Sequence, residues 1–495
     1  MKNYLDELNE PQRLAVEATE GPLMVIAGAG SGKTRVLTYR IAHLIEKGVS
    51  PFNILALTFT NKAAREMKER ISSVVGPGEA KNLWMGTFHS IFARILRVEA
   101  PRLGYPSDFT IYDSQDSQSV IRKVIEELQL DKDIYKYKQV AHRISQFKNN
   151  LITVRAYHNT PELIEADAAA MRPRMGEVYR AYVDKCFKSG AMDFDDLLLR
   201  TNEVLTRFPE VLAKYQDRFR YILVDEYQDT NHSQYLIVKA LASRYENLCV
   251  VGDDAQSIYA FRGANIRNIL SFKNDYPDAK VIPLEQNYRS TKTIVGAANQ
   301  VIAQNKDQLE KNVWTSNEMG ESIPVYRALT DADEARYVAS QIWELQVNKQ
   351  LKHKDFAILY RTNAQSRAIE EALRKRNLPY KVFGGTSFFQ RKEIKDLVAY
   401  LRILVNPNDE EALLRIINYP KRGIGQTTIN KLMIVASESE KPIFEILENI
   451  HQYAAKAGLN AATVYKLNEF TIMIKSFMTM LNDHDVYEVS MHVAK

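Results

Sequence analysis

The chain has 495 residues, which is too long for one hydrophobic core, so we expect two to four domains. Hydrophobic residues make up 45% of the chain, and no apolar run approaches the roughly 20 residues of a membrane span, which excludes an integral membrane protein. The net charge of +5 permits a polyanionic partner without demonstrating one. Two cysteines, Cys186 and Cys249, make neither a disulfide framework nor a metal site, and no signal-peptide core follows Met1, so we expect a cytoplasmic protein.

Five short apolar runs are typical of parallel strands that are buried on both faces. Polar residues follow each run directly, and ligands of open α/β sheets bind at the carboxyl ends of the strands. The sequence therefore predicts an α/β fold with its functional residues along one sheet edge. The runs are Leu23–Ala27, Ile54–Phe59, Tyr221–Val224, Leu248–Val251 and Val281–Leu284.

Helical patterns interrupt and follow these runs. Residues 91–208 are almost wholly helical in pattern, and a helical insertion into an α/β domain is the simplest account. After Arg289 a second α/β pattern begins, with a predicted strand at Phe356–Tyr360 and an amphipathic helix at Thr362–Arg374. From about residue 386 the pattern is helical again.

The first predicted strand ends in a glycine-rich loop, and a helix-compatible segment follows at Arg35–Lys47. This strand–loop–helix order is the context of a phosphate-binding loop, in which backbone N–H groups and the helix N-terminus surround phosphate oxygens. Lys33 would reach the β- and γ-phosphates, and the Thr34 hydroxyl would hold Mg²⁺. The alternative is a glycine-rich turn without a ligand. The expected loop residues are Ala27, Gly28, Ala29, Gly30, Ser31, Gly32, Lys33 and Thr34, with Ala27 in place of the usual first glycine.

The strand at Tyr221–Val224 delivers two carboxylates at its end. In a P-loop enzyme we expect Asp225 to hold Mg²⁺ and Glu226 to orient and deprotonate the attacking water. The alternative is a solvated acidic strand end.

Another buried strand is followed by Gly252-Asp-Asp-Ala-Gln-Ser-Ile-Tyr-Ala-Phe-Arg-Gly263. Gln256 is a neutral donor that could sense the γ-phosphate. Tyr259, Phe261 and Arg262 place aromatic faces and a guanidinium just beyond it, which suits base stacking on single-stranded nucleic acid. The alternative is an aromatic cluster that belongs to the core.

A fourth motif, Leu284-Glu-Gln-Asn-Tyr-Arg-Ser290, begins the second α/β pattern. Arg289 would be an arginine finger that reaches from one domain to a nucleotide bound on the other and stabilises charge during phosphoryl transfer. An ordinary surface salt bridge is the alternative.

With these four motifs in order, the chain resembles superfamily 1 DNA helicases of the UvrD/Rep/PcrA type over essentially its whole length. The resemblance implies RecA-like parallel-sheet motor domains with largely helical inserted subdomains. The first motor domain would comprise 1–90 and 209–280, with the helical insertion at 91–208. The N-terminal part of the second motor domain would lie at 281–385, and the start of the helical 2B domain at 386–495.

The resemblance also implies ATP and Mg²⁺ as ligands. Gln12, in Leu8-Asn-Glu-Pro-Gln12, would read the adenine edge, and Arg35 and Tyr288 would pack around adenine and ribose. Backbone amides at Gly423 and Gly425 of a helix–turn–helix would bind duplex phosphates. Contacts with single-stranded DNA are implied for Phe59, Asn61, His89, Tyr259, Phe261, Arg262, Arg361, Thr362 and Asn363. The segment Asp193-Phe-Asp-Asp196 also resembles a family motif, although a helix N-cap with an acidic first turn explains it equally well.

Two late family motifs, one with a second arginine finger, are not found, and the sequence given stops at Lys495 within the expected 2B domain. We therefore expect a truncated chain that binds ATP and hydrolyses it inefficiently. The expected parent activity is ATP-dependent 3′-to-5′ unwinding of DNA in repair or replication. Its expected partners are single-stranded DNA, junctions with duplex DNA and unidentified repair or replication proteins, and it would act as a monomer or weak dimer. The alternatives are a non-motor fragment that binds nucleotide and DNA, part of a recombination helicase–nuclease subunit, and a P-loop metabolite kinase.

Overall fold

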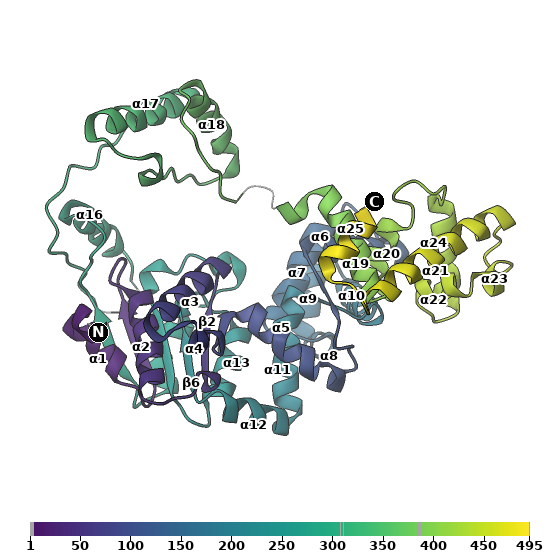
Figure 1. Ribbon diagram of the computed structural model, residues 1–495, viewed down its shortest axis with the longest axis horizontal. Helices are drawn as coiled ribbons and strands as arrows, with labels where there is room; N and C mark the ends of the chain where they lie inside the picture. The colour runs from purple at the N-terminus through teal and green to yellow at the C-terminus, as the bar shows by residue number, and fades with distance from the viewer. Residues whose placement is uncertain (1–3, 307, 310, 385–387, 495) are drawn as a thin grey trace. The chain divides into compact units, whose positions relative to one another are not determined.

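The computed structural model describes residues 4–306, 308–309, 311–384 and 388–494, except the side chain of Arg262. The chain divides into two compact units. The first comprises the chain up to Gly320 together with Ala399–Val493, and the second comprises Glu321–Val398. The elements can be followed along the chain in Figure 1.

The first unit is built on a six-stranded parallel sheet with the strand order β3-β2-β6-β7-β1-β8. The register places Ile26 beside Gly252 and Val224 beside Val250, so the carboxyl ends of neighbouring strands lie at one edge. The strands are β1 (Leu23–Ala27), β2 (Ile54–Thr58), β3 (Trp84–Thr87), β6 (Tyr221–Val224), β7 (Leu248–Gly252) and β8 (Lys280–Leu284).

All five apolar runs form strands of this sheet, as predicted. The sequence did not predict β3, because Trp-Met-Gly-Thr contains no apolar run. The strand β8 lies at the boundary expected at residue 281, and it pairs with β1 from Leu23 opposite Lys280 to Ala27 opposite Leu284. The strand thus completes the first sheet, and the loop after it lies beside the loop after β1.

The four central strands, β2, β6, β7 and β1, are buried and mostly apolar because helices cover both faces of the sheet. Leu23 and Val25 face one core together with Val36 and Ile41, whereas the alternate strand residues, such as Met24, face a second core. Cys249 is buried in the first core, as its position in an apolar run indicated. The helices of this region are α1 (Glu10–Glu17), α2 (Lys33–Glu46), α3 (Asn61–Val75), α4 (Pro77–Lys81), α5 (Phe88–Glu99), α12 (Pro209–Arg218), α13 (His232–Ala242), α14 (Arg267–Leu270), α15 (Phe272–Asp275) and α16 (Lys292–Ile302).

Helices occupy most of residues 91–208, as predicted. A two-stranded parallel sheet of β4 (Thr110–Tyr112) and β5 (Ala191–Asp193) interrupts them. The helices are α6 (Ser114–Glu127), α7 (Tyr137–Asn149), α8 (Val154–His158), α9 (Pro161–Ala169), α10 (Met175–Lys188) and α11 (Phe194–Arg207).

The C-terminal part of the first unit has a separate helical core. The segment between α19 and α20 packs on the helical insertion through buried polar contacts. Asn406 donates a hydrogen bond to Thr110 over 3.1 Å, and Tyr112 donates one to Asp409 over 3.1 Å. The helices are α19 (Lys392–Val405), which begins in the second unit, α20 (Glu410–Ile416), α21 (Gln426–Glu438), α22 (Ile443–Glu448), α23 (Ile450–Tyr453), α24 (Ala461–Met480) and α25 (Val486–Ala494).

The second unit contains α17 (Asp331–Lys349) and α18 (Ser366–Lys375), which share a small core around Ala335 and Leu373. The predicted strand at Phe356–Tyr360 is wrong: no strand is formed among the described residues of this unit. A strand needs a neighbour to satisfy its N–H and C=O groups, and no paired extended segment is present there. In neither unit does a described helix combine the length and the apolar character needed to cross a bilayer.

Candidate functional site

The loop between β1 and α2 has the backbone of a phosphate-binding loop. Gly30 has φ +70° and Gly32 has φ +91°, conformations that favour glycine. A Cβ on Gly32 would also lie 2.8 Å from Nε2 of Gln12. Ala27 ends β1 with a fully buried side chain, so the residue at the usual first glycine position packs in the core and the loop still forms.

Lys33 is the first residue of α2, directly after this loop, and its ammonium group is buried with few partners. The Nζ atom is buried and has no hydrogen-bond partner among the described residues. It lies 3.3 Å from Oε2 of Glu226, as an ion pair. A buried ammonium at the N-terminus of a helix fits a phosphate anion.

Asp225 and Glu226 follow β6, as predicted. Asp225 is buried, and burial together with the charge of Glu226 raises the pKa of Asp225 to about 7 against the opposing effect of Lys33. A cation beside this carboxylate would favour its ionised form, which fits Mg²⁺ held by Asp225 and Thr34. The described residues contain no group of three His, Cys, Asp or Glu ligands. Mg²⁺ does not require one, because it keeps several waters and takes phosphate oxygens as ligands.

Gln256 belongs to a turn after β7, and its side chain is held by a neighbour. Its Nε2 donates to Oδ2 of Asp253 over 2.7 Å. The backbone N–H of Asp253 donates to Gln228, whose own Nε2 donates to Glu226 over 2.9 Å. A hydrogen-bonded chain therefore connects Gln256 with the Glu226–Lys33 pair.

The loop after β8 lies directly on the phosphate-binding loop. Asn287 donates from Nδ2 to the Ala29 carbonyl over 2.6 Å, and the Tyr288 N–H donates to the Gly30 carbonyl over 3.0 Å. Arg289 is exposed, and a Cβ on Gly30 would lie 2.9 Å from its Cβ. Arg289 belongs to the same compact unit as the phosphate-binding loop, and its role as an arginine finger stays a prediction. The pairing of β8 with β1 explains this placement.

The residues expected around adenine come together beside this loop. Gln12 is buried and donates from Nε2 to the Ser31 carbonyl over 2.8 Å, so it shapes the phosphate-binding loop. Tyr288 accepts a hydrogen bond from Asn9 over 2.7 Å, which joins the loop after β8 to the start of α1. Arg35 is exposed in the first turn of α2. The adenine contact of Gln12, Arg35 and Tyr288 stays a prediction.

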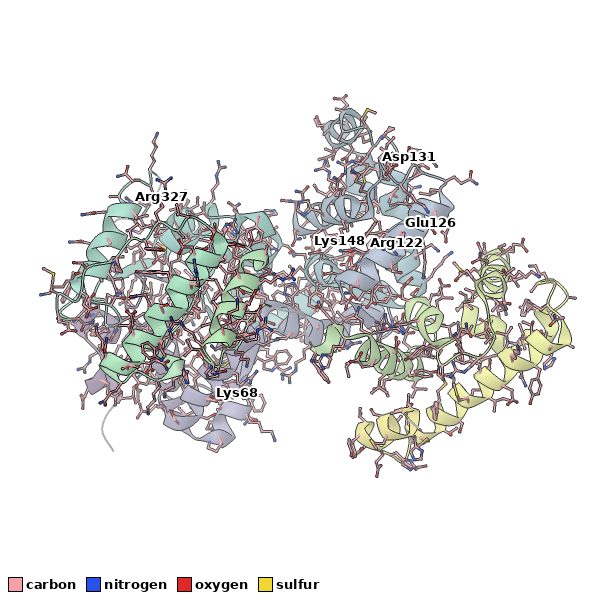
Figure 2. All side chains as sticks on the ribbon, turned by 90° about the horizontal axis from the view of Figure 1, so that it is seen from above. Lys68, Arg122, Glu126, Asp131, Lys148 and Arg327 are labelled. Atoms are coloured by element: carbon pink, nitrogen blue, oxygen red, sulfur yellow. The ribbon has the colours of Figure 1, made fainter. Side chains whose placement is uncertain are left out.

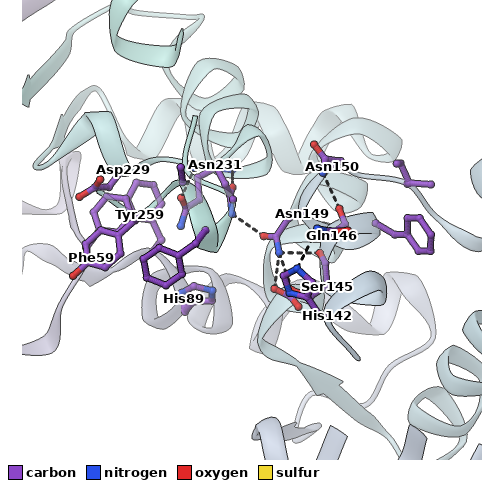
Figure 3. Close-up of a pocket in the computed structure, with 18 of the residues that line it drawn as sticks. Phe59, His89, His142, Ser145, Gln146, Asn149, Asn150, Asp229, Asn231 and Tyr259 are labelled. Atoms are coloured by element: carbon purple, nitrogen blue, oxygen red, sulfur yellow. Dashed lines mark hydrogen bonds between the residues drawn. The ribbon is translucent and has the colours of Figure 1, made fainter. Parts of the chain in front are cut away.

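A cavity of about 960 Å³ opens beside the carboxyl ends of β2 and β3. Four predicted DNA contacts line it: Phe59, His89, Tyr259 and Phe261. Figure 3 shows Phe59 and Tyr259 at one side of this cavity. Burial lowers the pKa of His89, which therefore presents a neutral ring. Asn61 begins α3 and is not among the lining residues, and the side chain of Arg262 lies outside the described residues.

The opposite wall of the cavity is the polar face of α7, which sequence analysis did not identify. His142, Gln146, Asn149 and Asn150 line it. Asn231 donates to Asn149 over 2.7 Å, and this contact ties the wall to the segment before α13 (Figure 3). Amides at helical spacing on α7 were the available signal, but such a pattern is also typical of any solvated helix face.

Asp193 and Asp196 are structural. They form a capping box at the start of α11, and both accept hydrogen bonds from the fully buried Lys148 over 2.7 Å. Although burial alone lowers the pKa of an amine, the two carboxylates hold the pKa of Lys148 well above its usual value. Figure 2 places Lys148 within the helical insertion. The capping interpretation is confirmed for Asp193 and Asp196, whereas Asp195 lines the cavity.

The remaining predicted DNA contacts belong to the second unit and to the C-terminal helices of the first. Arg361, Thr362 and Asn363 are exposed in the second unit, and their contacts with DNA stay a prediction. Gly423 and Gly425 lie in the turn between α20 and α21, as a helix–turn–helix requires. Asn418 closes that turn by accepting from the N–H groups of Arg422 and Ile424.

Comparison with known proteins gives the family. Residues 8–277 match the UvrD/REP helicase N-terminal domain, and residues 282–473 match the UvrD-like helicase C-terminal domain. The ATP-dependent DNA helicase PcrA of Staphylococcus aureus is 48% identical over 491 residues, which cover 99% of this chain and 66% of that protein. The protein of the same name from Staphylococcus epidermidis is 47% identical over 492 residues, 99% of this chain and 65% of its own length. The chain thus spans about two thirds of these relatives, and it belongs to the UvrD/REP helicase family.

Proposed function

We propose that this chain carries the ATP-dependent motor of a 3′-to-5′ DNA helicase that moves on single-stranded DNA and opens junctions with duplex DNA. Relatives that carry the name ATP-dependent DNA helicase support this proposal. A role in repair or replication, a cytoplasmic location near the nucleoid, and a monomer or weak dimer belong to the same proposal.

One observation carries the proposal: residues suited to nucleotide and residues suited to DNA share one sheet edge and one charge network. Asp229 lines the aromatic cavity. Burial and the charge of Glu226 raise the pKa of Asp229 to about 6, and Lys33 opposes this rise. The charges of Glu226 and Lys33, at the phosphate-binding loop, therefore act on Asp229 in the wall of the cavity. This electrostatic interaction between the two sites supports the proposal that DNA stimulates hydrolysis.

The residues divide the chemistry among them. Lys33 would exchange its ion pair with Glu226 for phosphate oxygens, which frees the Glu226 carboxylate to accept a proton from water as the water oxygen attacks the γ-phosphorus and ADP leaves. Gln256 would contact the γ-phosphate, and Arg289 would stabilise charge on it. Mg²⁺ held by Thr34 and Asp225 would neutralise charge on the phosphates.

At the cavity, the faces of Phe59, Tyr259 and Phe261 would stack on bases of any sequence. A change at Gln256 on nucleotide binding would be passed along the chain to Tyr259 and Phe261, which follow it by three and five residues. Alternating grip on the bases would then produce steps along the strand.

The test is steady-state ATP hydrolysis with and without single-stranded DNA. We expect DNA to stimulate hydrolysis in the unmutated chain, and we expect Lys33→Ala to abolish it. Lys47→Ala, at the other end of α2, is the matched control and should keep full activity. Hydrolysis that DNA does not stimulate, or that survives in Lys33→Ala, would overturn the motor proposal.

A second candidate is a protein that binds nucleotide and DNA without coupling them. One observation favours it: the described residues of the second unit form no sheet that could present a second set of nucleotide contacts. A strand-displacement assay run beside fluorescence anisotropy separates the two. Salt-sensitive DNA binding with no displacement supports this second candidate.

A further inference from the structure

The stretch Lys311–Trp314, which follows α16, runs beside the loop after β8. Trp314 donates its N–H to the Glu285 carbonyl over 3.0 Å, and Asn287 donates its N–H to the Trp314 carbonyl over 2.7 Å. The N–H of Asn312 donates to the Glu285 carboxylate over 2.7 Å. Backbone N–H and C=O groups of the stretch are therefore both hydrogen-bonded to the loop that carries Arg289.

The same stretch also contacts the phosphate-binding loop. A Cβ on Gly28 would lie 2.6 Å from Cγ2 of Val313, so the valine fills the space over this glycine. The stretch is thus held on two sides, and it delivers Lys311 to the turn after β7.

The ammonium group of Lys311 forms ion pairs with two buried carboxylates, those of Asp253 and Asp254. Its Nζ lies 2.9 Å from Oδ1 of Asp253 and also pairs with Asp254. The three side chains are 6%, 3% and 1% exposed, so water screens these charges little. Two buried carboxylates would repel each other strongly without this cation, and Lys311 fixes the orientation of the Asp253 carboxylate.

The Asp253 carboxylate has one oxygen for Lys311 and the other for Gln256. Oδ1 is taken by Lys311 and by the N–H of Ala255, whereas Oδ2 accepts from Nε2 of Gln256 over 2.7 Å. Nε2 carries two hydrogens, so one is held by Asp253 and the second remains as a donor. Asp254, in contrast, accepts from Lys311 and from the N–H of Leu309.

We propose that Lys311 is a positioning residue: by holding Asp253, it orients the amide of Gln256 so that the second N–H is preorganised for the γ-phosphate of a bound nucleoside triphosphate. This rests on the proposed function only in assigning the nucleotide to the phosphate-binding loop. No DNA is needed for it. Discrimination between nucleoside triphosphate and diphosphate is the property that Lys311 controls.

The cluster allows a charge-matched test. Asp254→Asn removes one carboxylate but leaves the contacts from Lys311 through Asp253 to Gln256 in place. Lys311→Met combined with Asp254→Asn removes the lysine as well, and the cluster keeps the net charge of the unmutated protein. The double variant therefore tests the orientation of Asp253 without leaving two buried carboxylates unpaired.

The measurement is the ratio of two dissociation constants, for Mg²⁺–ADP and for the Mg²⁺ complex of the non-hydrolysable β,γ-imido analogue of ATP. A hydrogen bond to a charged group corresponds to about tenfold or more in affinity. We expect the double variant to lower the preference for the analogue by about tenfold, with the affinity for ADP unchanged, and Asp254→Asn to keep the preference. In a Gln256→Ala background, the double variant should cause no further loss.

Three binding results would overturn the proposal. These are an unmutated chain that does not prefer the analogue over ADP, an equal loss in Asp254→Asn and in the double variant, and an undiminished effect in the Gln256→Ala background. The melting temperatures of all variants are measured beside the constants, and a double variant that does not fold makes Lys311 a structural residue and also overturns it. Absence of DNA-stimulated hydrolysis would reject the motor but leave this ratio interpretable, so the two failures are distinguishable.

Discussion

Lys33 and Glu226 form an ion pair of 3.3 Å between the phosphate-binding loop and the end of β6. The pair joins the group expected to bind phosphate to the group expected to activate water. Each side chain therefore restrains the other until an anion takes the place of Glu226 beside Lys33. The pair keeps a buried cation partly compensated in the absence of nucleotide.

This relationship predicts that Glu226→Gln lowers the rate of hydrolysis without weakening nucleotide binding. Neutralising Glu226 removes the competitor for Lys33, so the affinity for the non-hydrolysable ATP analogue should stay the same or rise. Loss of the general base should lower kcat by about 10²–10⁴-fold. Equilibrium binding and single-turnover hydrolysis check the two effects. The control is Glu66→Gln, which breaks an exposed pair with Lys62 on α3. Weaker binding together with unchanged hydrolysis would contradict the assignment of Glu226.

Asp225→Asn should stabilise the chain when nucleotide and Mg²⁺ are absent. Burial and the charge of Glu226 raise the pKa of Asp225 from 3.8 to about 7, so the folded state disfavours the ionised form. This destabilisation is absent below the unfolded pKa, grows as pH rises through the folded pKa, and is complete at pH 8.

The expected gain in the free energy of unfolding at pH 8 is on the order of 1–4 kcal/mol, and it should shrink as pH falls toward 5. Thermal unfolding at both pH values measures it. A gain that is equal at the two pH values would show that titration of Asp225 is not its cause. The same variant should lose Mg²⁺-dependent hydrolysis, because an amide oxygen is a weaker ligand than a carboxylate.

Phe261→Ala should weaken binding of single-stranded DNA with little effect on the fold. The Phe261 side chain is 71% exposed and lines the cavity. Loss of one stacked base corresponds to about 1–3 kcal/mol, or roughly 5- to 150-fold in affinity. Fluorescence anisotropy with labelled oligothymidine measures the change. Phe52→Ala is the matched control, since Phe52 is also exposed and precedes the amino end of β2. Equal losses in the two variants would argue against the cavity as the DNA site.

Lys148→Met should destabilise the helical insertion. The variant would leave Asp193 buried without a cation and Asp196 with only the more distant Arg200, and breaking a buried ion pair in this way typically costs about 3–5 kcal/mol. Lys188→Met, in the last turn of α10, removes an exposed lysine and should be neutral. Chemical denaturation compares the two. A Lys148→Met chain as stable as the control would contradict the structural role of the cluster.

Sequence reasoning located the groups that lie at strand ends. Hydrophobic runs predict where strands β1, β6 and β7 end, and parallel pairing brings those ends to one edge. Lys33, Asp225 and Gln256 therefore followed from local pattern alone. The segment that begins at Asp193 shows the limit of such patterns. Its sequence fits a functional family motif and a helix N-cap equally well, so the sequence alone does not distinguish the two.

Other features depended on pairing between distant segments. Arg289 belongs with the phosphate-binding loop because β8 pairs with β1, and the sequence does not state which sheet a strand joins. Nothing in the local sequence distinguishes Lys311 from the other lysines, because its contacts with Asp253 and Asp254 form only in the folded chain. The α7 wall faces the cavity for the same tertiary reason. The predicted strand at Phe356–Tyr360 has the right composition, but a strand forms only where a partner is present.

The central claim is that the nucleotide site and the DNA site are energetically coupled. The most direct measurement is the affinity for labelled oligothymidine in the presence of Mg²⁺–ADP and of the Mg²⁺ complex of the non-hydrolysable ATP analogue. We expect the two affinities to differ by about 5-fold or more, and we expect DNA to change the relative affinity for the two nucleotides by the same factor. Equal DNA affinity in both nucleotide states would contradict this claim.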